Sequence, residues 1–326
     1  MVPFILRRLI QAIPTLLLCS IVIFFVISLA PGDFLTPAKL NPGITQQQLD
    51  NLARNFGLDK SPLEQYLLWF RNMLTGDLGL SFMYQAPVQN VIWSRIGNSM
   101  WLVVAILFIN YAVAIPLGVY GAVKQNTLFD RVSNVFVYFM LGFPSFFLAL
   151  IALYLLVQLQ FATGIKLPIG GMTSDGFLQM NALEKLWDIL KHIAIPALLV
   201  GIQSTAGLSR FLRALTLEVL NSDYIRTARA KGVSERSAIW KHTVRNAILP
   251  LVAGLGGTLP NLIGGAGFIE VVFAYPGITP MLLDALAAQD LYLIAGFTMV
   301  TTVLLVLGNI VADILTSVVD PRVKAA

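Results

Sequence analysis

The chain has 326 residues, 57% of them hydrophobic and only 12% charged, and its formal net charge is +5. Because a water-soluble domain carries about 25% charged residues, this composition excludes a surface that faces water on all sides and predicts that most of it faces lipid. Cys19 is the single cysteine, so no disulfide framework or thiolate metal site can form within the chain. His192 and His242 lie too far apart to predict a metal cage, and we interpret both as ordinary loop or helix-end residues.

Six stretches predict membrane-spanning helices, each of which needs about 20 mostly apolar residues. They are Leu9–Leu29, Trp101–Val123, Val132–Leu156, Ile193–Ser209, Ala247–Phe268 and Leu291–Ala312. Pro144 is expected to kink the third. We interpret the first as a retained anchor rather than a cleaved signal peptide, because its apolar run exceeds the roughly 7–15 residues of a signal-peptide core.

The distribution of lysine and arginine predicts the orientation of these spans. With a cytoplasmic N-terminus, fourteen of the 22 basic residues fall on the cytoplasmic side: Arg7, Arg8, Lys124, Arg131, Arg210, Arg213, Arg226, Arg229, Lys231, Arg236, Lys241, Arg245, Arg322 and Lys324. This bias follows the positive-inside rule, places both termini in the cytoplasm and explains the basic charge without nucleic acid. The predicted layout is a first transmembrane helix at 1–29, an extracytoplasmic loop with amphipathic helices at 30–100, and a five-helix core at 101–326 with a cytoplasmic loop at about 210–246.

Two amphipathic helices are predicted in the 30–100 loop. Thr45 and Gln48 form a capping box before one helix, which ends at Gly57, and Ser61 and Glu64 form a second box before a helix that ends at Gly76. The helices are expected to pack on the outer mouth of the bundle through the apolar residues Leu49, Leu52, Phe56, Leu67, Phe70 and Leu74. They could serve as a structural cap or as a docking surface for an external partner, and the sequence leaves both interpretations open.

The central portions of the six spans contain no ionisable residue. Their polar residues are neutral, such as Asn110, Gln203, Asn261 and Asn309, while Glu270 and Asp313 are expected at helix ends. A proton relay has no carrier in this pattern, and an intramembrane enzyme has no catalytic pair or metal-ligand spacing. The chain also has no phosphate-binding loop of the type G-x-x-x-x-G-K-[ST], so uphill transport would need energy from a partner.

The predicted cytoplasmic loop is the most informative segment. Ser222 or Asp223 can cap a short helix, Gly232 supplies a left-handed turn that ends it, and Ser234 can cap the next helix with Glu235 near its positive end. By composition alone, such a basic amphipathic loop could simply bind anionic lipid headgroups.

The loop also resembles a known family. Y-I-R-T-A-R-A-K-G at Tyr224–Gly232, followed by R-N-A-I-L-P at Arg245–Pro250, is similar to the coupling loop of binding-protein-dependent ABC importer permeases, dipeptide/oligopeptide (peptide/nickel) subgroup. The general signature E-A-A-x3-G-x9-I-x-L-P is matched at Ala228 and Gly232, whereas Arg226 and Thr227 replace its Glu and first Ala. His242, Val244 and Arg245 replace I-x-L-P, and the proline comes later, at Pro250, which is the form that the peptide subgroup shows. Further similar stretches follow in order at Arg7–Leu17, Ala30–Asp33, Gly76–Gly79, Pro144–Leu148, Phe268–Gly277 and Asp320–Arg322.

This resemblance implies an all-α, type I ABC importer permease that is not itself an enzyme and holds no cofactor, metal or catalytic residue. The implied partners are a second homologous permease forming a heterodimer, two cytoplasmic P-loop ATPase subunits that bind ATP and Mg, and an extracytoplasmic solute-binding protein, in the cytoplasmic (inner) membrane of a bacterium or archaeon. The implied ATPase-coupling residues are Tyr224, Arg226, Ala228, Arg229, Lys231 and Gly232.

The implied solutes are di- or oligopeptides, with nickel, glutathione or oligosaccharides as alternatives in the same family. A self-sufficient secondary transporter or channel is a more remote alternative. The sequence does not identify substrate-pathway residues. The fifth span is crowded by glycines that could allow close helix packing or line the pathway with unwound backbone: Gly254, Gly256, Gly257, Gly264, Gly265 and Gly267.

Overall fold

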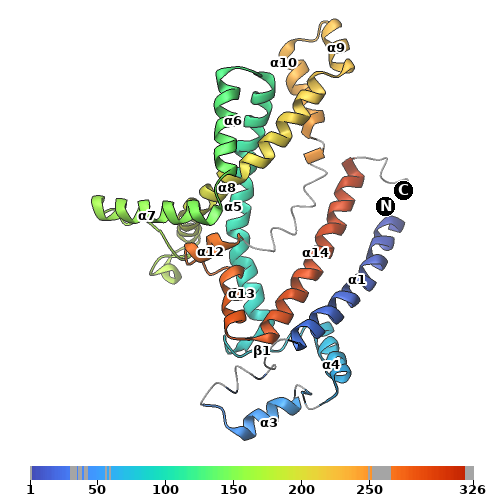
Figure 1. Cartoon of the computed structure of the whole chain (residues 1–326), viewed down its shortest axis with the longest axis vertical. Helices are drawn as coiled ribbons and strands as arrows, with labels where there is room; N and C mark the ends of the chain where they lie inside the picture. The colour runs from blue at the N-terminus through green and yellow to red at the C-terminus, as the bar shows by residue number, and fades with distance from the viewer. Residues whose placement is uncertain are drawn as a thin grey trace.

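The computed structural model describes residues 2–29, 35, 39, 43–55, 57–58, 60–248, 250–251 and 266–319, and these are predominantly α-helical (Figure 1). Within them, five helices are long and apolar enough to cross a membrane: α1 (Val2–Ser28), α5 (Val88–Val123), α7 (Ser145–Thr163), α8 (Ala182–Leu220) and α14 (Leu291–Val319). The first, second, fourth and sixth predicted spans fall on α1, α5, α8 and α14. The fifth, Ala247–Phe268, lies largely outside the described residues.

The third predicted span, Val132–Leu156, is wrong because the chain is broken there rather than kinked. α6 (Leu128–Leu141) ends before Gly142, and α7 begins at Ser145, directly after Pro144. Pro144 has no backbone N–H with which to continue the hydrogen-bond ladder of α6, and the side-chain amide of Gln203 on α8 donates to the carbonyl of Phe143. The break separates α6, which packs on α8, from α7, which projects sideways (Figure 1).

α5 and α8 form the central helix pair, and both exceed the length that a bilayer requires. Their 36 and 39 residues extend about 54 and 58 Å at about 1.5 Å per residue. Two glycines permit their contact: a Cβ on Gly118 would lie 2.7 Å from the carbonyl oxygen of Ser209, and a Cβ on Gly201 would lie 2.8 Å from the Cβ of Ile109. Small residues let membrane helices approach closely, so a larger side chain at either glycine would push α5 and α8 apart.

α1 and α14 run antiparallel beside this pair (Figure 1). An ion pair joins Nε of Arg8 on α1 to Oδ2 of Asp313 on α14 at 3.1 Å. Asp313 therefore lies within α14, before its last turn, rather than at a helix end as predicted.

α3 (Gln46–Asn55) and α4 (Pro62–Leu74) lie at one end of the molecule, and both predicted capping boxes are confirmed. The N–H of Thr45 donates to Gln48 at 2.8 Å, and the N–H and hydroxyl of Ser61 donate to the Glu64 carboxylate at 3.1 and 2.8 Å. The hydrogen bonds from Ser61 lower the pKa of Glu64 below its usual value. Gly57 and Gly76 follow the two helices with positive φ angles of 66° and 85°, as expected of helix-ending glycines.

The predicted apolar face of α4 is only partly right. Tyr66 and Trp69 are the buried residues of α4, and their rings pack near Phe24 of α1. Leu67 and Leu74 are instead 56% and 70% exposed. The aromatic face is buried because rings remove more apolar surface from water than leucine does, and because the Tyr66 hydroxyl forms a 2.9 Å hydrogen bond with Ser20. Phe70 and Leu49 are half-buried, while the side chains of Leu52 and Phe56 lie outside the described residues.

A short antiparallel hairpin of β1 (Leu80–Ser81) and β2 (Ala86–Pro87) precedes α5. Buried Asp290 joins this hairpin to α14, because its carboxylate accepts the Ser81 hydroxyl at 2.7 Å and the N–H of Leu293 at 3.2 Å. A 3₁₀ turn (Phe177–Gln179) lies between α7 and α8, and α12 (Phe268–Val272) and α13 (Ile278–Ala287) precede α14.

Candidate functional site

The loop after α8 carries the helix that the sequence analysis singled out. Only two residues separate α9 (Asp223–Ala230) from the end of α8, and the second of them, Ser222, is at the N-cap position. The Ser222 hydroxyl donates to the carbonyl of Val219 at 2.6 Å instead of accepting an N–H from α9. Asp223 lies in the first turn, where its negative charge complements the positive end of the helix dipole. α9 and α10 lie at the end of the molecule opposite α3 and α4 (Figure 1).

Gly232 ends α9 in the left-handed turn that the sequence predicts. Its φ is 83°, its N–H donates to the carbonyl of Arg229 at 3.0 Å, and the N–H of Val233 donates to the carbonyl of Ala228 at 3.2 Å. These two bonds are the Schellman pattern of helix termination. A Cβ on Gly232 would meet no atom within 4 Å, so this position needs glycine for its backbone conformation and not for space.

One face of α9 is anchored and the other is exposed. Ile225 is fully buried and holds the helix against the rest of the chain, and Ala228 is half-buried. The other predicted coupling residues share one property, since all are exposed: Tyr224, Arg226, Arg229, Lys231 and Gly232. The outer face therefore presents a 47% exposed tyrosine among basic side chains, which suits contact with an acidic or polar surface.

The arginine side chains on this face form solvent-exposed ion pairs. Arg226 lies 3.5 Å from Asp223, and Arg229 donates to Glu235 at 2.7 Å across the glycine turn. Ion pairs this exposed contribute about 0–1 kcal/mol. Both arginines can therefore exchange these partners for carboxylates on another protein at little cost.

The chain returns to the bundle through α10 (Glu235–Ser237) and a π-helical turn (Ala238–Val244), whereas the sequence predicted an ordinary helix after Ser234. The hydroxyl of Thr243 donates to the carbonyl of Ala238, five residues earlier, at 3.0 Å. Such turns are rare and are frequent at functional sites. His242 lies in the last turn of this segment. His192 is buried inside α8, so its interpretation as a loop or helix-end residue is wrong.

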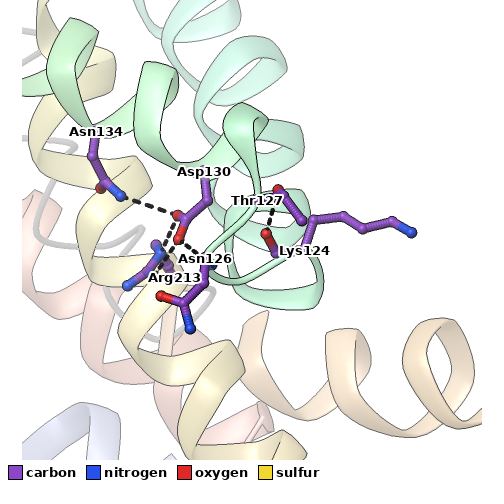
Figure 2. A network of polar contacts seen from close by, with 6 residues as sticks. All are labelled: Lys124, Asn126, Thr127, Asp130, Asn134 and Arg213. Atoms are coloured by element: carbon purple, nitrogen blue, oxygen red, sulfur yellow. Dashed lines mark hydrogen bonds and ion pairs between the residues drawn. The ribbon is translucent and has the colours of Figure 1, made fainter.

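A polar network that the sequence analysis missed lies beside this loop (Figure 2). Asp130, in the first turn of α6 and 4% exposed, accepts from Nε and Nη2 of Arg213 on α8, both at 2.9 Å. It also accepts the N–H of Asn126 and the side-chain amide of Asn134, both at 3.0 Å. The Arg213 guanidinium lowers the pKa of the Asp130 carboxyl and keeps it ionised. Asp130 and Arg213 both lie outside the central apolar stretches of the predicted spans. Nothing in the sequence indicates that these two residues are in contact.

Comparison with known proteins assigns the chain to a family. A family model described as binding-protein-dependent transport system inner membrane component matches residues 114–325, and the N-terminal model for such membrane components matches residues 1–103. The chain belongs to this family. It is therefore a multi-pass membrane permease component of a transport system and not an ATPase, which confirms the resemblance drawn from its cytoplasmic loop.

Named relatives match the permease over its whole length. It is 33% identical to the oligopeptide transport system permease protein of Bacillus subtilis over 325 residues, which cover 99% of this chain and 100% of the relative. It is 37% identical over 328 residues to a putative peptide permease protein of Brucella suis, with 99% of each chain covered. It is 32% identical over 342 residues to the dipeptide transport system permease protein of Escherichia coli, again with 99% of each covered.

The remaining sequence predictions for the permease concern its acidic residues and its glycines. Glu270, expected at a helix end, lies in short α12 and is fully buried. The glycines at 254, 256, 257, 264 and 265 lie outside the described residues, and Gly267 directly precedes α12 with a φ of 67°.

Proposed function

We propose that this chain is one of two permease subunits of an ATP-driven importer of di- or oligopeptides in the cytoplasmic membrane of a bacterium or archaeon. The support is its full-length similarity to relatives named as oligopeptide, dipeptide and peptide permeases. Nickel, glutathione or oligosaccharides remain the alternative solutes, and the solute-binding partner supplies the selectivity.

The second permease subunit is a non-identical homologue, and two cytoplasmic P-loop ATPases bind ATP and Mg and deliver energy to the pair. An extracytoplasmic solute-binding protein delivers the peptide. This assignment places α9 in the cytoplasm and α3 and α4 outside, which agrees with their positions at opposite ends of the molecule (Figure 1). The chain itself holds no cofactor under this proposal.

The proposed mechanism rests on one observation. The exposed helix α9, which ends at a glycine, follows almost directly on α8, which is long enough to span a membrane. α9 sits in a groove of an ATPase subunit, where Tyr224, Arg226, Ala228, Arg229, Lys231 and Gly232 form the contact. Because only two residues separate α8 from α9, a displacement of α9 moves α8 with it. ATP-driven closure of the ATPases thereby switches the pathway between its inward- and outward-facing states.

The test begins with purification of the tagged chain from its native membrane in mild detergent, with its partners identified by mass spectrometry. The complex is then reconstituted into vesicles, and ATP-dependent uptake of a labelled dipeptide and a labelled tetrapeptide is compared with uptake of nickel, glutathione and an oligosaccharide. Peptide uptake that requires the ATPases and the binding protein is expected. Transport by the purified chain alone would favour a secondary transporter or channel and overturn the proposal.

A further inference from the structure

α6 is attached to α8 by polar bonds at both of its ends. In the first turn of α6, Asp130 holds the two-pronged contact with Arg213 at 2.9 Å. Beyond its last turn, the carbonyl of Phe143 accepts the side-chain amide of Gln203, which also belongs to α8. Pro144 breaks the helix between α6 and α7, so the two are not one rigid rod.

Both arms of the α9 loop reach the turn between α5 and α6. The outgoing arm is α8, where Arg213 lies seven residues before Leu220 and thus about 10 Å from the helix end at 1.5 Å per residue. The returning arm is the π-helical turn, where the ring of Trp240 lies 6.0 Å from that of Tyr120 near the end of α5. Tyr120 in turn lies 6.4 Å from Phe129 of α6.

The two contacts differ in what they can transmit. Aromatic rings in edge contact can slide over one another, whereas a guanidinium that forms two parallel hydrogen bonds with a carboxylate fixes distance and orientation. A buried ion pair is also weak evidence for a purely stabilising role, because well-packed apolar residues of similar volume often give equal or higher stability. α6 and α8 also pack against each other along their surfaces, so the ion pair is one of several contacts that hold these two helices together.

We propose that Asp130 and Arg213 are positioning residues for transport, whose ion pair makes α6 move with α8 when α9 is displaced. The inference rests on the proposed function of α9 and adds the element that receives its motion. Through the pair, a shift of α8 carries the first turn of α6 and the 124–127 turn before it. Without the pair, the first turn of α6 no longer follows α8 although Gln203 still holds the other end, and ATP hydrolysis no longer yields a complete switch of the pathway.

The experiment uses the complete complex in vesicles and measures solute imported per ATP hydrolysed, normalised to assembled complex. The variants are Asp130→Asn, Arg213→Gln, their double mutant and Arg213→Lys. Arg131→Gln is the matched control, because Arg131 is the exposed neighbour of Asp130 on α6. Thermal stability of each complex is measured in parallel.

Arg213→Gln is expected to lower thermal stability most, because it leaves the buried Asp130 carboxylate without its cation, and the double mutant is expected to recover part of that loss. The solute-to-ATP ratio is expected to fall about fivefold or more in Asp130→Asn and in Arg213→Gln, and to stay low in the double mutant. Arg213→Lys keeps the charge but loses the fork geometry, so an intermediate ratio is expected.

If the pair has a purely structural role, the solute-to-ATP ratio of the double mutant should recover together with its thermal stability. A ratio like that of the wild type in any variant lacking the pair overturns the proposal, whatever its stability. If the wild-type complex shows no ATP-dependent uptake, the proposed function fails and this inference falls with it. Uptake by the wild type with an unchanged ratio in the variants removes only the role of the pair.

Discussion

The hydroxyl of Ser99 on α5 donates to Oε1 of Glu270 at 2.6 Å and at the same time accepts the backbone N–H of Ile278 at 2.9 Å. The fully buried Glu270 also accepts the N–H groups of Ala266 at 3.1 Å and Thr279 at 2.9 Å. This carboxylate therefore organises the segment from 266 to 279 over α5. All three donors belong to the protein itself, so we assign the Glu270 side chain a structural role.

Replacing Glu270 is expected to destabilise the permease. Glu270→Gln turns an acceptor that serves three donors into an amide whose NH₂ group faces a backbone N–H. Because a hydrogen bond to a charged group contributes about 1.5–3 kcal/mol, a clear fall in the thermal unfolding midpoint of the detergent-purified protein is expected. Ser99→Ala should give a smaller fall in the same measurement.

Ser94→Ala is the matched control, since among the described residues the Ser94 hydroxyl bonds to the carbonyl of Val91 in its own helix. It should leave the unfolding midpoint unchanged. If Glu270→Gln instead keeps full stability but loses transport in a pH-dependent way, Glu270 acts in proton transfer and the structural role assigned to it is wrong.

Substitutions at Gly232 should show whether transport depends on the backbone conformation at this position or on the small size of the residue. The φ of 83° admits asparagine, but it disfavours alanine by about 1–2 kcal/mol and a β-branched residue more strongly. We therefore expect Gly232→Asn to keep ATP-dependent uptake and Gly232→Val to lose about tenfold or more, with membrane insertion intact in both. Uptake is measured in vesicles and insertion by protease protection.

Ala228→Asp provides an independent test on the same helix, because it adds a negative charge to the half-buried side of α9. It should also abolish uptake while leaving insertion intact. Normal uptake by both Gly232→Val and Ala228→Asp would contradict the coupling role of α9.

Local features could be predicted from the sequence, and contacts between distant residues could not. The end of α9 at Gly232 was predictable because the Schellman bonds join residues only three to five positions apart. Four spans were predictable from uninterrupted apolar composition. The break at Pro144 was not, because the carbonyl of Phe143 at the break is satisfied by Gln203, sixty positions after Phe143. The Asp130–Arg213 pair was missed for the same reason, since it depends on α6 packing against α8.

Removing the amide of Gln203 should weaken the junction between α6 and α7. Gln203→Leu leaves the carbonyl of Phe143 without this donor, and polar bonds between membrane helices contribute about 0.6–2 kcal/mol. A modest fall in the unfolding midpoint is expected. Ser204→Ala is the control, because the Ser204 hydroxyl bonds to Gly201 within α8. Equal midpoints for the two variants would show that the break needs no donor from α8.

The two faces of α4 should respond differently to substitution. Trp69, 8% exposed, belongs to the inner face, so Trp69→Ala should cost about 3–5 kcal/mol of stability. Leu67, 56% exposed, belongs to the outer face, so Leu67→Gln should leave the unfolding midpoint unchanged.

The same pair of variants decides between the two roles that the sequence left open for α4. If the outer face docks an external partner, Leu67→Gln should weaken binding of the solute-binding protein to the reconstituted complex at unchanged stability, because it removes apolar contact area from the interface. If α4 is only a structural cap, binding to the Leu67→Gln complex equals that of the wild type, and loss of binding follows loss of stability in Trp69→Ala alone. Titration of the binding protein against both complexes, with uptake measured in parallel, separates the two outcomes.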